Sequence, residues 1–87
     1  MKLDNDHLHV LRALARGDTL KSHRDIDGGK RYQLHALDGA ATIVTASTME
    51  FLKTQQLVDS NKKFPAATYL LTEAGRRALA SREAPLT

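Results

Sequence analysis

The chain has 87 residues, which is the length of one small domain, and its formal net charge of +3 permits an anionic partner. Hydrophobic residues make up 41% and charged residues 26% of the chain, a profile typical of a folded domain rather than a disordered one. The absence of cysteine excludes disulfides, thiolate metal sites and cysteine nucleophiles. No apolar run reaches the ~18 residues of a membrane helix, and the polar start lacks a signal-peptide pattern, so we expect a cytoplasmic protein.

The first predicted element is a helix over residues 5–16. Leucines recur at helical spacing, and an aspartate or asparagine at positions 4–6 can cap the first turn. Gly17 then suits the end of the helix, because a glycine adopts positive φ without a steric penalty.

A β-rich stretch follows from residue 19 to residue 44. Apolar side chains fall on even positions in 20–26 and again in 32–36, so the two strands of a hairpin must pair even with even. A three-residue loop at 28–30 meets this condition and predicts that His23 lies opposite His35. Two histidines do not make a zinc site, so we expect no metal. A turn at Asp38-Gly39 leads to a third strand over 41–44.

The second half of the chain predicts a helix, a hairpin and a last helix. Ser47 and Glu50 form a capping-box pattern that begins the helix, and strands at 57–59 and 68–71 flank a loop at 60–65. Thr72 caps a last helix that runs to about residue 81. We expect one domain over 1–82 and a flexible tail over 83–87.

The in-phase apolar positions of these elements predict one hydrophobic core. Its expected members are Leu8, Leu11, Leu14, Ile26, Leu34, Met49, Leu52, Leu57, Tyr69, Leu71 and Leu79.

The segment from residue 46 to residue 80 resembles the winged-helix domains of bacterial regulators such as the MarR and PadR families. The residues that carry the resemblance are Leu57-Val58, the basic loop after them, and the run Tyr69-Leu70-Leu71-Thr72-Glu73-Ala74-Gly75-Arg76. The resemblance implies a small α+β winged-helix-like domain, ordered α-β-β-β-α-β-β-α. The sequence of this chain differs from the family pattern in two places. Gln56 stands where the family usually has glycine, and the hairpin at 19–44 replaces the first helix of the helix-turn-helix.

The resemblance implies a DNA-binding, transcription-related module of bacterial or prophage type. Double-stranded DNA would be bound by the recognition helix and by the tip of the wing, because amides read base edges while lysines and hydroxyls hold phosphates. The candidate residues are Ser47, Thr48, Lys53, Gln55, Gln56, Lys62 and Lys63. A solvated helix face and lysines that protect a hairpin edge explain the same residues without DNA.

The alternative function is a small phage-type protein-interaction module, an inhibitor or adaptor on the same scaffold, in which Phe64 would contact the partner. A homodimer is compatible with both functions. The chain carries no phosphate-binding glycine loop and no hydrolase or protease motif, so we expect neither an enzyme nor a cofactor.

Overall fold

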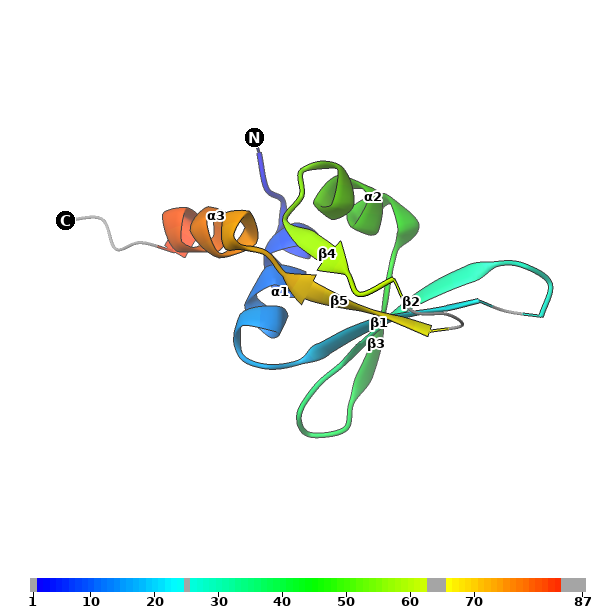
Figure 1. The fold of residues 1–87 in the computed structure, drawn as a ribbon. Helices are drawn as coiled ribbons and strands as arrows, with labels where there is room; N and C mark the ends of the chain where they lie inside the picture. Colours follow the sequence, from blue (N-terminus) through cyan, green and yellow to red (C-terminus); the bar gives the residue numbers. More distant parts are fainter. Residues whose placement is uncertain (1, 25, 63–65, 84–87) are drawn as a thin grey trace.

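A computed structural model describes residues 2–24, 26–62 and 66–83 as a small α+β domain. Its elements are α1 (Asn5–Ala15), β1 (Thr19–Arg24), β2 (Lys30–His35), β3 (Ala41–Val44), α2 (Ala46–Thr54), β4 (Val58–Ser60), β5 (Ala66–Leu71) and α3 (Glu73–Glu83). This order confirms the predicted succession of elements. The five strands form one antiparallel sheet with the order β3-β2-β1-β5-β4, and β1 and β2 form a long hairpin that projects away from the helices (Figure 1).

The core lies on one face of this sheet. Alternate strand residues, among them Leu20, Leu34 and Tyr69, are buried there against leucines and a methionine of α1 and α2. Of the predicted core, Leu14, Leu71 and Leu79 are partly buried, whereas Ile26 is fully exposed. The prediction that Ile26 joins the core is therefore wrong.

The register of the β1–β2 hairpin explains this error. Even residues pair with even residues, as predicted, but the last paired positions are Arg24 and Lys30, so the connection holds five residues instead of three. Leu20 lies opposite Leu34 in this register, whereas the predicted loop would have placed Arg24 opposite Leu34. The observed register buries Leu20 and Leu34 together against the core, and this stabilises the sheet more than a register that buried Ile26 near the tip would.

The predicted starts of the first two helices have different outcomes. Asp4 caps α1 as expected: its Oδ1 accepts a hydrogen bond from the His7 backbone N–H at 2.9 Å, and the Asp4 N–H donates to His7 Nδ1 at 3.1 Å. The predicted cap Ser47 is wrong, because the side chain of Thr45 accepts from the Thr48 backbone N–H at 3.3 Å. Since β3 ends at Val44, α2 begins directly after it, and Ser47 lies inside the first turn.

The junction between α2, β4 and α3 is tightly packed. The hydroxyl of Thr72 donates to the Gln56 carbonyl at 2.7 Å and accepts from the Gly75 N–H at 2.9 Å, which confirms Thr72 as the cap of α3. Gly75 is buried, and a Cβ there would overlap the Leu57 carbonyl oxygen. This close approach of two backbones is the reason for a glycine at this position.

Candidate nucleic-acid interface

The exposed side of α2 carries fewer of the predicted DNA contacts than the sequence suggests. Ser47 is exposed and Lys53 is half-buried, but Thr48 is buried and its hydroxyl accepts a hydrogen bond from Thr45 Oγ1 at 3.0 Å. Thr48 therefore supports the start of the helix and is not available to a phosphate. Glu50 is exposed between these positions, so the formal charge of this surface is close to zero.

The two glutamines lie at the C-terminal end of α2. Gln55 and Gln56 are both exposed, and the backbone of Gln56 has φ of 59°, the left-handed conformation that glycine adopts most readily. Here the Leu57 N–H donates to the Leu52 carbonyl at 2.9 Å and closes the turn. The turn into β4 is thus made by a glutamine in a backbone conformation that favours glycine.

Lys62 lies at the other end of β4. It is exposed, and it follows Asn61, whose backbone and side chain form hydrogen bonds with Thr68 of β5 at 3.0 and 3.1 Å. A three-residue strand spans roughly 10 Å, so β4 separates Lys62 from the glutamines by at least that length. Lys63 and Phe64 lie outside the described residues. The described DNA-contact candidates therefore form two separate groups, one on α2 and one at Lys62.

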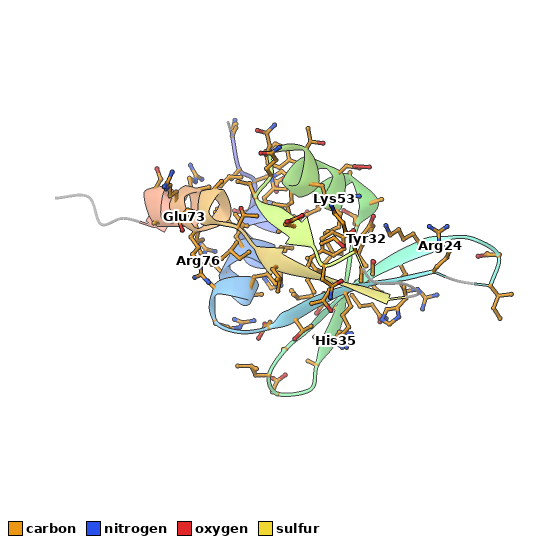
Figure 2. The ribbon with its side chains drawn as sticks, in the orientation of Figure 1. Arg24, Tyr32, His35, Lys53, Glu73 and Arg76 are labelled. Atoms are coloured by element: carbon orange, nitrogen blue, oxygen red, sulfur yellow. The ribbon has the colours of Figure 1, made fainter. Side chains whose placement is uncertain are left out.

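The sheet brings further basic side chains to the end that holds Lys62. The start of β5 pairs with β1 through Ala66 and His23, and the hairpin continues past this pair to Arg24 and Lys30. His23 lies directly opposite Arg31 on the sheet, and not opposite His35 as predicted. Figure 2 shows Arg24 at this end of the molecule and Arg76 of α3 at the opposite end.

Sequence reasoning missed these hairpin residues because it counted charge along the chain. Segment by segment the charge is small, since acidic residues such as Asp27 share the same stretch. Pairing the two strands in the predicted register did not reveal the contact either, because that register placed Arg24 opposite Leu34 and not opposite Lys30.

The ion pair between Arg16 and Asp18 has a structural role. The Asp18 carboxylate accepts two hydrogen bonds from the Arg16 guanidinium, at 2.7 and 3.0 Å, and one from the Leu37 N–H at 3.3 Å. The hydrogen bond from Arg16 lowers the pKa of Asp18, against the opposing effect of burial. This contact ties the end of α1 to the turn between β2 and β3.

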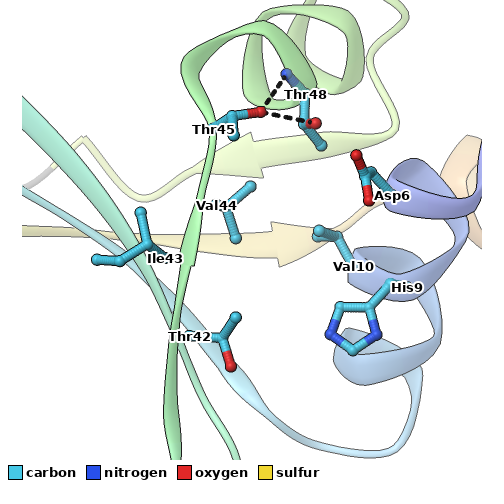
Figure 3. Close-up of a pocket in the computed structure, with 8 residues that line it drawn as sticks. All are labelled: Asp6, His9, Val10, Thr42, Ile43, Val44, Thr45 and Thr48. Atoms are coloured by element: carbon cyan, nitrogen blue, oxygen red, sulfur yellow. Dashed lines mark hydrogen bonds between the residues drawn. The ribbon is translucent and has the colours of Figure 1, made fainter.

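A surface pocket of about 140 Å³ lies between α1 and β3. Figure 3 shows its lining, with Asp6 and His9 from α1 facing Thr42 and Val44, and the paired hydroxyls of Thr45 and Thr48 above. A pocket of this size is below the roughly 300–1,000 Å³ of small-molecule sites. We therefore assign no ligand to it.

Two further classes of site find no support in the part of the chain that the structure describes. Within residues 2–24, 26–62 and 66–83, no three His, Asp or Glu side chains gather closely enough to hold a metal ion. His7 is buried and stacks on Phe51 with ring centroids 4.0 Å apart, which is a packing role. None of the described helices has the length and hydrophobicity needed to cross a membrane.

Comparison of the whole chain with models of protein families, with curated proteins and with solved structures finds no match in any of the three.

Proposed function

We propose that this domain binds double-stranded DNA, as a transcription-related module of winged-helix type from a bacterial or prophage source. The observation that carries the proposal is the convergence of Lys62 and the basic end of the β1–β2 hairpin at one end of the sheet. Lysine and arginine side chains gathered in this way supply the phosphate contacts that dominate affinity for duplex DNA. The proposal includes a cytoplasmic location.

The strand order supports the winged-helix part of the proposal. The adjacent antiparallel strands β4 and β5 follow α2 directly, at the place where the resemblance implies a β-hairpin wing. Thr72 caps α3 and Gly75 allows the close approach of α3 to Leu57, in agreement with the junction that carries the resemblance. In this proposal Ser47, Lys53, Gln55 and Gln56 face the duplex along α2, and Lys62 contacts its backbone.

A protein-interaction module is the second candidate, favoured by a different observation. Among the described residues, the large apolar side chains that are exposed are Ile26, Leu37, Ile43 and Leu70. They come from the hairpin tip, the β2–β3 turn, β3 and β5. Single exposed apolar residues are common on protein surfaces, so a contiguous patch would be needed to favour this candidate over DNA binding. A homodimer remains compatible with either candidate.

Fluorescence anisotropy with a random 20-base-pair duplex tests the proposal. The wild-type protein should bind with an affinity that falls steeply between 50 and 200 mM salt, because each phosphate contact releases a counterion. The double variant Lys53→Ala/Lys62→Ala should shallow the plot of log K against log salt by up to about 2. Gln55→Ala should instead alter sequence preference by ~1–3 kcal/mol and leave the slope unchanged.

The control variant Arg76→Ala/Arg77→Ala removes the same charge from α3, where both side chains are exposed. It should change the slope much less. No duplex affinity for the wild-type protein at 50 mM salt would refute the proposal. Leu37→Ser and Ile43→Ser then become the informative variants for the protein-interaction candidate.

A further inference from the structure

The outer half of the β1–β2 hairpin carries basic side chains on both of its faces. Arg24 and Lys30 lie directly opposite each other, and so do His23 and Arg31 in the neighbouring pair. Successive residues of a strand point to opposite faces, so these two pairs project to opposite sides of the ribbon. Beyond the body of the domain, the hairpin is thus a narrow two-stranded arm with cationic groups above and below.

The pairing of Arg24 with Lys30 does not by itself stabilise the hairpin. Like charges directly opposite each other on a sheet are destabilising. Arg24 is exposed and forms no ion pair with a described residue, and Lys30 Nζ lies 5.6 Å from the centroid of the Tyr32 ring. The Asp27 carboxylate at the tip accepts a hydrogen bond from the Gly29 N–H, which gives it a role in the turn. An anionic partner would relieve the repulsion between Arg24 and Lys30.

The shape of the arm indicates what kind of anion it fits. A flat acidic surface could meet only one face of the ribbon, whereas the walls of a duplex groove place phosphates on both sides. The major groove of B-DNA, about 12 Å wide, admits a two-stranded ribbon. Single strands are bound mainly by stacking on aromatic rings, and both tyrosines, Tyr32 and Tyr69, are buried in the core.

We propose that the β1–β2 hairpin is a nucleic-acid-binding arm that enters a groove of duplex DNA, with Arg24 and Lys30 contacting phosphates on one side and His23 and Arg31 facing the other side. This inference rests on the proposed function and adds the binding element that sequence reasoning did not find. The hairpin occupies the place in the chain where the first helix of a helix-turn-helix would stand. It would supply contacts that α2, with its nearly neutral exposed side, does not.

The test measures binding of a random 20-base-pair duplex by the double variant Arg24→Ala/Lys30→Ala over a range of salt concentrations. Each lost phosphate contact should shallow the slope of log K against log salt by about 0.9, and should weaken binding about eightfold at 0.1 M salt. The Arg76→Ala/Arg77→Ala variant carries the same net charge and serves as the matched control. The melting temperature of the hairpin variant should stay close to that of the wild type, because removal of the like-charge pair offsets the loss of the contact between Lys30 and the Tyr32 ring.

The outcomes separate this inference from the proposed function. A slope unchanged by Arg24→Ala/Lys30→Ala but shallowed by Lys53→Ala/Lys62→Ala would overturn the inference, and duplex binding would then depend on α2 and Lys62 without the hairpin. The reverse result would support the arm and argue against α2 as the main contact. Binding of poly-L-glutamate without any duplex affinity would overturn both in favour of an acidic protein partner.

Discussion

Replacement of Gly75 by alanine tests the packing between α3 and the turn before β4. A Cβ at this position would lie inside contact distance of the Leu57 carbonyl oxygen and 2.6 Å from Leu71 Cδ1. The Leu57 carbonyl cannot easily move away, because it also accepts the Thr72 N–H at 3.1 Å. The overlap is therefore with backbone that a second hydrogen bond holds in place.

The magnitude follows from two opposing effects. Alanine gains about 1 kcal/mol over glycine in a helix, whereas overpacking of this kind costs typically about 1–3 kcal/mol and more where backbone must shift. We expect a net loss of about 2 kcal/mol in the free energy of unfolding. For a domain of this length that corresponds to a fall in melting temperature of roughly 8–16 °C.

Urea denaturation followed by circular dichroism measures this change. Ala80→Gly is a suitable control, because Ala80 is exposed on the same helix and should lose only about 1 kcal/mol from helix propensity. A Gly75→Ala variant that is as stable as the wild type would refute the close contact between α3 and Leu57.

Three further predictions concern caps, turns and pH. Thr45→Ala should cost about 1 kcal/mol of stability and Ser47→Ala close to none, as measured by chemical denaturation, because the Thr45 side chain caps α2. Gln56→Gly should stabilise the domain by about 0.5–1 kcal/mol in the same assay, since φ is positive there. The hydrogen bond from Arg16 lowers the pKa of Asp18 in the folded state. The ionised Asp18 carboxylate therefore adds to the free energy of unfolding above the unfolded pKa of about 3.9, and this stabilisation is lost as the pH falls through the lower pKa of the folded state. Asp18→Asn should accordingly be less stable at neutral pH and show a flatter loss of stability in acid, which denaturation at several pH values would detect.

The sequence predicted features that depend on local pattern. The order of elements, the even-to-even pairing of the hairpin, Thr72 as a cap and Gly75 as a point of close approach all agree with the structure. Each of these features follows from the chemistry of one residue or from the period of one element. None of the four requires knowledge of contacts between residues far apart in the sequence.

The errors arose where several local solutions were equally good. Alternation of apolar residues defines which faces pair but not by how many residues a strand is shifted, so Ile26 seemed as suitable for the core as Leu20. Thr45 and Ser47 both have capping chemistry, and only the end of β3 at Val44 decides between them. The pairing of Arg24 with Lys30 depends on that same register and could not be read from charge counted along the chain.

An NMR titration of the ¹⁵N-labelled protein with a 16-base-pair duplex tests the central claim most directly, because it locates the bound DNA on the fold. The account predicts that the backbone amides of the β1–β2 hairpin, of the exposed side of α2 and of Lys62 shift together, and that the shifts weaken as salt is added. Shifts confined to α3, or no shifts at low salt, would contradict it.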